Sequence, residues 1–244
     1  GVGPYLDGLF TQSNFGIVTK VVVWLMPEPD RFNMFYFSVP RDHDIRKVIR
    51  ALRPLKMKGV LSSLVHIGND LRVISSFHRY PWDQTGGSTP LPESVRERFR
   101  KKGRFGAWNV SGAIYGTKKQ VAAARSEIRK ATRGLARVKY MTDAKVALAK
   151  RIGDFLESRS MWNELVVMIR SLEKVYGLLK GVPTDAFLFG TLWRVRGRET
   201  PATLDPLDNR AGILWVSPIL PVRGSAAEEL LDIVNPIFGR YGFE

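Results

Sequence analysis

The succession of apolar and polar positions predicts strands and helices that alternate from the start of the chain. Residues Gly16–Met26 (GIVTKVVVWLM) are dense in β-branched side chains and stop at prolines, a pattern typical of a buried strand. A second strand is predicted at Asn33–Val39, and Asp42–Leu55 follows with apolar residues at helical spacing. Val60–Ser76 is ambiguous, although Asp70 is suited to cap a short helix.

A second unit of strand, helix and strand follows a stretch rich in turn residues. Phe77–Pro92 (FHRYPWDQTGGSTPLP) is an aromatic loop of a length that compact domains use mostly for function. Phe105–Tyr115 alternates like a strand. Thr117–Gly134 begins with a threonine N-cap and ends at a glycine, the usual limits of a helix. Arg137–Met141 is predicted to return as a strand beside the first one.

The remaining chain begins the pattern once more. Thr142–Arg159 and Met161–Lys180 are helical by spacing, Gly212–Leu220 reads as a strand, and Ser225–Tyr241 reads as an amphipathic helix. These units predict an α+β fold of the ferredoxin-like (split βαβ) type, a mainly antiparallel sheet with helices on one face. Because the last unit lacks a following strand and the chain opens on glycine, we expect a sequence truncated at both ends.

The composition is that of a globular protein with an excess of positive charge. The 244 residues are 44% hydrophobic, enough for a core, and no run approaches the roughly 20 apolar residues that a membrane span needs. Lysine and arginine outnumber aspartate and glutamate by 38 to 23, which gives a net charge of +15 and favours an anionic partner. One basic cluster follows the aromatic loop: Arg96, Arg98, Arg100, Lys101, Lys102 and Arg104.

Two kinds of macromolecule fit these basic residues. Nucleic-acid binding calls for basic residues interleaved with exposed aromatic ones, whereas the aromatic residues here mostly lie in strand patterns that bury them. The cluster Arg96–Arg104 therefore favours a protein-docking module for an acidic electron-transfer partner over a nucleic-acid-binding ferredoxin-like domain. No nucleic acid is expected.

Few residues indicate catalysis by themselves. The sequence has no cysteine, and its three histidines show no ligand spacing, so no metal site is predicted. It contains no nucleophile-elbow motif and none of the common glycine-rich phosphate loops. In the aromatic loop, Tyr80, Trp82 and Asp83 either line a pocket or pack within a folded loop, and the packed loop is favoured.

The most informative segment is Gly3–Lys20 (GPYLDGLFTQSNFGIVTK), which joins a glycine-rich turn to the first predicted strand. Small and amide side chains beside a glycine let backbone N–H groups approach a polyanion closely. An ordinary loop that enters a strand is the alternative, and composition alone favours it.

This segment resembles a known family. The run GPYLDGLFTQSNFGIVTKVVVWLMPEP is similar to the end of the flavin-binding domain in the vanillyl-alcohol oxidase and p-cresol methylhydroxylase flavoprotein family, with Thr11 and Phe15 in place of serine and methionine. Further matches follow in order along essentially the whole chain, with thin similarity between residues 142 and 208: Arg53–Leu55, Gly106–Asn109, Gly112–Gly116, Trp215–Ile219 and Tyr241–Phe243.

The resemblance implies an FAD-dependent oxidoreductase, of the oxidase or methylhydroxylase type, that acts on 4-substituted phenols or similar aromatic compounds. In this family a split flavin-binding domain holds FAD, and a cap domain built on a ferredoxin-like sheet covers the flavin ring. Residues 1–30 would then be the last segment of the N-terminal FAD-binding portion. Residues 31–244 would be a cap domain that is incomplete at its C-terminal end. The implied FAD contacts, mostly through the backbone, are Gln12, Ser13, Asn14, Gly16, Ile17 and Val18.

The family's chemistry places its catalytic groups elsewhere. A phenolate is held there by two tyrosines and an arginine, and hydride passes from the benzylic carbon to flavin N5. These residues and the flavin-linking residue match positions outside this chain, so no catalytic residue is predicted and the fragment alone is expected to be inactive. On the substrate side we expect Tyr80 and Trp82 from the aromatic loop, and Trp215 and Ser217 from the later family match.

The resemblance also bears on partners. It implies an aromatic small-molecule substrate and allows a cytochrome c subunit, since flavins of this family are reoxidised either by oxygen or by such a subunit. Family members often form dimers, so a homodimer is open. The compartment, cytoplasmic or periplasmic, is open as well.

Overall fold

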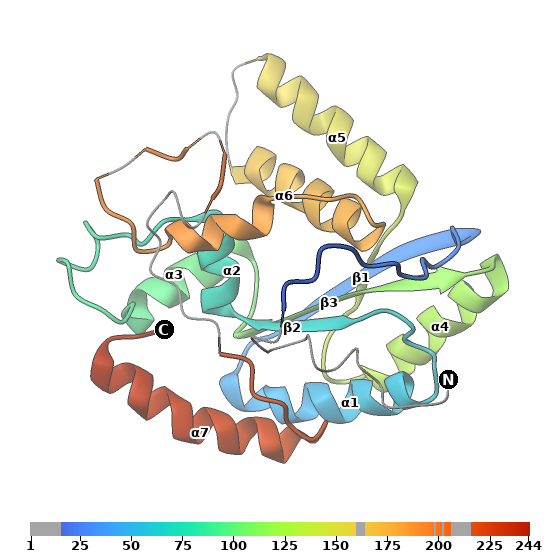
Figure 1. Cartoon of the computed structure of the whole chain (residues 1–244), viewed down its shortest axis with the longest axis horizontal. Helices are drawn as coiled ribbons and strands as arrows, with labels where there is room; N and C mark the ends of the chain where they lie inside the picture. Colours follow the sequence, from blue (N-terminus) through green and yellow to red (C-terminus); the bar gives the residue numbers. More distant parts are fainter. Residues whose placement is uncertain (1–15, 160–163, 198, 202, 206–215) are drawn as a thin grey trace.

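The structure, a computed structural model, describes residues 16–159, 164–197, 199–201, 203–205 and 216–244. Its centre is a four-stranded antiparallel sheet with the strand order β2-β3-β1-β4 (Figure 1). The strands are β1 (Arg31–Val39), β2 (Val65–Asn69), β3 (Trp108–Gly116) and β4 (Lys139–Met141). The α-helices are α1 (Ile45–Met57), α2 (Asp70–Phe77), α3 (Glu93–Gly103), α4 (Lys118–Ala131), α5 (Asp143–Ser158), α6 (Glu164–Leu179) and α7 (Gly224–Tyr241).

Both helical crossovers skip one strand. Helix α1 connects β1 to β2 across β3, and α4 connects β3 to β4 across β1. The strand order therefore interleaves two strand–helix–strand units. The prediction of an α+β fold with an antiparallel sheet is confirmed.

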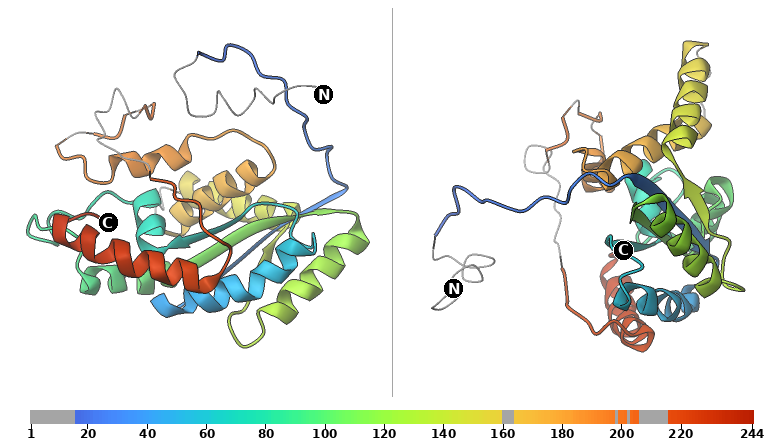
Figure 2. Two further views of the ribbon diagram at one scale, coloured as in Figure 1. Left: turned by 60° about the horizontal axis from the view of Figure 1, so that its bottom comes forward. Right: turned by 90° about the vertical axis from the view of Figure 1, so that its right-hand side faces the viewer.

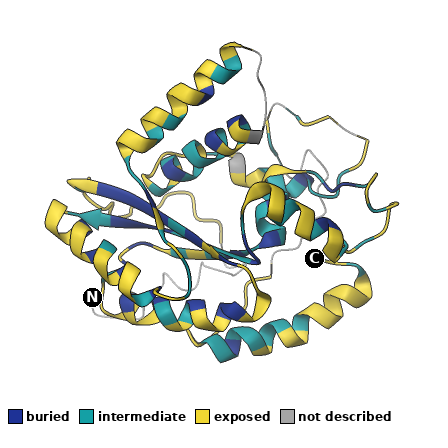
Figure 3. Cartoon of the chain, turned by 180° about the vertical axis from the view of Figure 1, so that it is seen from behind, coloured by how far each residue is buried: buried dark blue, intermediate teal, exposed yellow. Residues whose placement is uncertain are grey.

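The sheet is covered on both faces, so the expectation of helices on one face is wrong. Alternate residues of β1, such as Phe35 and Phe37, enter a core formed with α1 and α4. Residues on the opposite face of β1, Phe32 and Met34, pack in a second cluster with Tyr176 of α6. The reason is that β1 is apolar on both sides, a property of strands that are covered twice. Figure 3 shows this burial along the strands, in contrast to the largely exposed α5.

Close backbone approaches fix the sheet to its surroundings. A Cβ atom added at Gly106 would lie 2.1 Å from the carbonyl oxygen of Val39, so only glycine fits there. Just before β2 begins, the side chain of the buried Ser63 continues the pairing with β3. Its Oγ accepts from the backbone N–H of Ala113 at 2.9 Å and donates to the carbonyl oxygen of the same residue at 2.8 Å.

Helix limits follow the predicted signals with two differences. Thr117 and Gln120 form a capping box at the start of α4, as the sequence pattern predicts. Helix α1 does not end at Pro54 but continues to Met57, because Leu55 is buried in the core. The N-cap of α2 is Asn69, whose side chain accepts from the N–H of Arg72 at 2.8 Å, and not Asp70.

The predicted buried strand Gly16–Met26 is absent, because the described residues 16–29 have no regular secondary structure. Their side chains are exposed, with Val22 at 89% and Trp24 at 102% of full accessibility. Figure 2 shows this extended segment leading away from the sheet. No described strand lies beside it to accept its hydrogen bonds or cover its side chains. Residues 216–220 of the predicted strand Gly212–Leu220 are likewise extended and exposed, and residues 212–215 lie outside the described part.

Within the described ranges, no helix combines the length and apolar character that crossing a bilayer would take.

Candidate functional site

The segment expected to contact FAD is an exposed, extended strip of backbone. Gly16, Ile17 and Val18 are all exposed, Ile17 at 92%. Among the described residues, none forms a backbone–backbone hydrogen bond with residues 16–29. Within the described part of the chain, their N–H and C=O groups have no backbone partner, so this part leaves them available to a ligand or another strand. The other three expected contacts, Gln12, Ser13 and Asn14, lie outside the described residues.

A cavity of about 1230 Å³ opens where this segment joins β1. One wall is residues 25–33, and the others come from α4, including Arg125, and from the end of α6 with the residues that follow it. Its aromatic wall is Phe32 with Tyr115, whose ring centroids are 5.6 Å apart. Tyr115 Oη donates a 2.8 Å hydrogen bond to the carbonyl oxygen of Leu179, which ties the sheet to the end of α6.

A polar group borders this cavity. The ammonium of Lys180 donates to Asp143 Oδ1 at 2.7 Å, and the hydroxyl of Tyr176 donates to the same oxygen at 3.1 Å. The hydrogen bond from Lys180 lowers the pKa of Asp143, so its carboxylate stays ionised. Burial, together with the bond to Asp143, raises the pKa of Tyr176. Tyr176 is therefore a neutral hydrogen-bond donor and not a base. No local pattern indicates this group, because Asp143 begins α5 whereas Tyr176 lies on α6 and Lys180 directly follows that helix.

The aromatic loop packs, as favoured from sequence, and also lines a pocket. Tyr80 is only 3% exposed, and its hydroxyl donates to the carbonyl oxygen of Ser88 at 2.6 Å. Its ring lies 4.3 Å from that of Trp82 and 5.2 Å from that of Trp193, measured between centroids. Tyr80 and Trp82 also line a pocket of about 590 Å³. Burial raises the pKa of Tyr80, which keeps its phenol neutral.

The two other expected substrate-side residues come from a later segment of the chain. Ser217 is exposed on the extended residues 216–220, and Trp215 lies outside the described residues. Sequence reasoning missed instead the residues that close the loop from later in the chain. Glu244 accepts from Trp193 Nε1 at 2.6 Å and pairs with Arg194 at 3.3 Å. These contacts span about 50 residues, beyond the reach of any local pattern.

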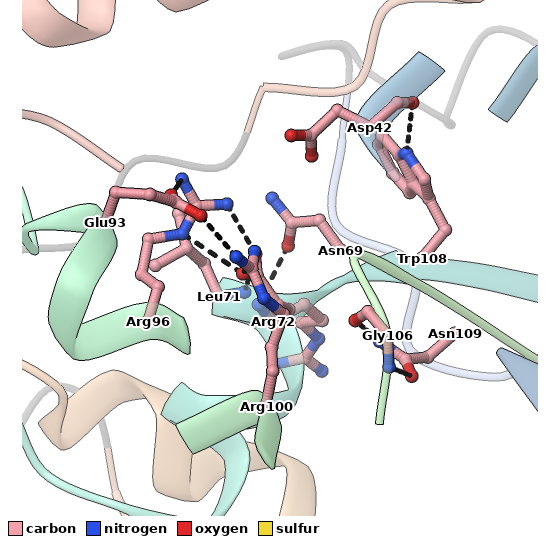
Figure 4. Close-up of polar contacts among 11 residues, drawn as sticks. Asp42, Asn69, Leu71, Arg72, Glu93, Arg96, Arg100, Gly106, Trp108 and Asn109 are labelled. Carbon is pink, nitrogen blue, oxygen red and sulfur yellow. Dashed lines mark hydrogen bonds and ion pairs between the residues drawn. The ribbon is translucent and has the colours of Figure 1, made fainter. Parts of the chain in front are cut away.

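The basic cluster Arg96–Arg104 is not one free surface, which corrects the expectation of a continuous docking patch. Asp70 is fully buried and accepts from Arg96 Nη2 and from Arg100 Nη1, both at 2.7 Å. Both arginines also pair with Glu93 (Figure 4). Two of the six charges therefore hold α3 against α2. A buried carboxylate requires such partners.

One of the family-matching motifs has a structural role. In Gly106-Ala107-Trp108-Asn109, the side chain of Asn109 accepts from the N–H of Gly106 at 3.1 Å and donates to its carbonyl oxygen at 2.9 Å. Trp108 Nε1 donates to the carbonyl oxygen of Asp42 at 2.7 Å (Figure 4). The motif thus shapes the entry to β3 and joins it to the residues before α1.

Comparisons with known proteins were made for the whole chain. No model of a known protein family matches it. The 1'-carboxy-chondrochloren decarboxylase of Chondromyces crocatus is 33% identical over 245 aligned positions. The 4-cresol dehydrogenase (hydroxylating) flavoprotein subunit of Pseudomonas putida is 30% identical over the same length. Both alignments cover all of this chain. A crystal structure of p-cresol methylhydroxylase with bound substrate superimposes with a TM-score of 0.76 and 27% identity over 99% of the chain.

The chain is homologous to part of the 4-cresol dehydrogenase flavoprotein subunit. The chain spans 40% of the length of the Pseudomonas protein and 45% of the length of the decarboxylase, less than half of either. It covers 40% of the p-cresol methylhydroxylase chain. A 4-ethylphenol oxidase from Gulosibacter chungangensis shares the fold, with a TM-score of 0.77 at 20% identity over 99% of the present chain and 41% of its own. The resemblance drawn from the sequence motifs is confirmed.

Proposed function

We propose that this chain is part of an FAD-dependent oxidoreductase that oxidises 4-substituted phenols. The observation that carries the proposal is the uninterrupted match. The chain aligns from end to end with a 4-cresol dehydrogenase flavoprotein subunit at 30% identity and superimposes on p-cresol methylhydroxylase with a TM-score of 0.76. A match confined to one motif would support only a shared local shape.

Residues 1–30 supply the end of the FAD-binding portion, and residues 31–244 supply part of the cap domain. The boundary is supported by the start of the sheet at Arg31, directly after the exposed residues 16–29. The interleaved order of four antiparallel strands supports a ferredoxin-like cap. Such a sheet, packed on both faces, is a rigid lid for a cofactor held beside it.

The described residues fit a flavin-contacting role. Gly16 has no Cβ and allows close approach, and the neighbouring backbone N–H groups are free to donate to an extended cofactor. The exposed side chains of Val22 and Trp24 lose contact with water when a partner surface covers them, which favours docking. When bound, FAD supplies the hydride acceptor at N5, and the protein supplies orientation and electrostatics.

A second candidate reaction is favoured by the more similar of the two relatives. The Chondromyces protein, at 33% identity, is named a decarboxylase of a carboxylated compound. We propose as the alternative that the substrate is a phenol whose 4-substituent carries a carboxylate, which leaves as carbon dioxide during oxidation.

Product analysis with the intact protein distinguishes the two reactions. The protein is incubated with 4-ethylphenol or with 4-hydroxyphenylacetate labelled in its carboxylate. Oxidation of 4-ethylphenol without turnover of the acid supports the phenol oxidase, and release of labelled carbon dioxide supports the decarboxylase. Turnover of neither, by a protein that contains flavin, contradicts both.

The flavin contact is tested separately by cofactor content. Gly16→Val places a side chain on the proposed contact strip, whereas Thr19→Val, an exchange of nearly equal volume outside the predicted contacts, places the same residue type three positions later. We expect the first variant to purify with less FAD than the second. Equal FAD content in both would contradict the placement of the cofactor.

A further inference from the structure

The pocket beside the aromatic loop has a composition that the proposed function does not use. It is an open depression with a volume of about 590 Å³, and small-molecule sites usually have volumes of roughly 300–1,000 Å³. Its walls include Arg79, Tyr80, Trp82, Asp83 and Arg196. None of its lining residues borders the larger cavity near β1.

Arg196 is held in place by an aromatic ring. Its guanidinium carbon lies 3.6 Å from the centroid of the Trp82 ring, a close cation–π contact. Its single hydrogen bond among the described residues runs from Nη2 to the carbonyl oxygen of Gly87 at 3.4 Å. No carboxylate in the described ranges pairs with it. The planar fork of N–H donors is therefore oriented in advance while most of its donors stay available.

Trp82 is the aromatic platform of this pocket. Its ring contacts the ring of Tyr80, and Arg196 stacks on it as well. Its Nε1 atom is buried out of reach of a ligand in the pocket, so the indole contributes its ring and not its N–H to recognition.

The charges around the pocket select the class of ligand. Arg196 has no carboxylate partner among the described residues, and a monoanion would supply one. A phosphate dianion would overcompensate that single charge and would face Asp83, which also lines the pocket. A carboxylate is planar and accepts two parallel N–H bonds from a guanidinium, and the aromatic walls suit an apolar body. We propose that this pocket binds a small organic carboxylate, with Arg196 as its recognition group and the ring of Trp82 as the platform that orients it.

Calorimetric titration of the intact protein with benzoate tests this site without any turnover. Benzamide has the same shape without the charge and serves as the neutral control ligand. Arg196→Met keeps an apolar chain near Trp82 and removes the charge. We expect it to weaken benzoate binding at least about tenfold, the size of a lost charge-assisted hydrogen bond. Arg98→Met, a change at an exposed arginine on α3, should leave binding unchanged.

Two further variants separate the charge from its orientation. Arg196→Lys keeps the charge but loses the planar fork, so an intermediate loss is expected. Trp82→Leu removes the aromatic platform that orients Arg196, and we expect a loss of a few fold. The proposal is overturned by an absence of saturable benzoate binding, by equal binding of benzamide, or by Arg196→Met binding as wild type does. Because heat of binding is the readout, failure here is independent of failure to oxidise phenols.

Discussion

The ion cluster around Asp70 should be the most sensitive polar element of the fold. Its carboxylate is completely buried and receives three hydrogen bonds from guanidinium groups, two from Arg96 at 2.7 and 3.1 Å and one from Arg100 at 2.7 Å. The backbone N–H of Leu71 adds a fourth at 2.8 Å. Asp70→Asn keeps the size of the side chain but removes the charge that the two arginines face.

The magnitude follows from what remains after the substitution. Removing one partner of a buried ion pair costs roughly 3–5 kcal/mol. Here Glu93 still pairs with both arginines, whose side chains keep 22% and 15% of their exposure to water. We therefore expect the lower end, about 3 kcal/mol. Glu93→Gln should cost less than about 1 kcal/mol, because the side chain of Glu93 is 55% exposed.

Urea unfolding of the intact protein measures both effects, with the slope of the transition checked for constancy. A double-mutant cycle adds a specific expectation. Glu93→Gln should cost more in the Asp70→Asn background, where Glu93 is the remaining counter-charge, than in the wild type. Glu97→Gln, which affects only the exposed pair with Lys101, is the matched control. A loss below about 1 kcal/mol for Asp70→Asn would refute the reasoning.

Three further predictions concern the sheet and the border of the larger cavity. Ser63→Ala leaves two buried backbone groups of β3 without a partner and should lower the free energy of unfolding by about 1–3 kcal/mol, measured by urea titration. Gly106→Ala drives a methyl group into the carbonyl of Val39 and should reduce the soluble yield, whereas Gly239→Ala, on α7 where the added Cβ meets no neighbouring atom, should reduce it much less. Asp143→Asn should destabilise by under about 0.5 kcal/mol at neutral pH, because the side chain is 66% exposed. Since the folded-state pKa of Asp143 is lowered, this contribution is present above its unfolded pKa and is lost as pH falls through the folded one, so the two proteins should converge in acid.

The sequence predicted those elements whose signals are local. Strand β1, strand β3 and helix α4 were expected close to their observed limits. The pattern of apolar residues identifies each strand within one short stretch, and a threonine cap marks the start of α4. Strand β2 (VHIGN) was not recognised, since it contains a glycine and an asparagine and becomes a strand through pairing with β3. Helix α1 passes Pro54 because tertiary packing of Leu55 outweighs the local signal.

Other features depend on partners that no local pattern contains. The β-branched run at Gly16–Met26 was expected to be buried, yet burial requires a neighbouring strand, and the described residues provide none. Arg96 and Arg100 were predicted to be surface charges, whereas in the fold both donate to the buried Asp70. The packing of α6 on the second face of the sheet was not predicted either, because it depends on contacts between residues far apart in the sequence. The family motifs indicated a flavoprotein, and the comparisons confirmed that relationship, whereas the individual FAD and substrate contacts stay predictions.

Anaerobic reduction of the flavin tests the central claim most directly. The intact protein is purified, its bound flavin is identified, and it is mixed without oxygen with 4-cresol or with 4-methylanisole, which lacks the ionisable hydroxyl. The account predicts bound FAD whose oxidised absorbance bleaches with 4-cresol and persists with 4-methylanisole. A protein that contains no flavin, or whose flavin stays oxidised with every 4-substituted phenol offered, carboxylated ones included, would contradict it.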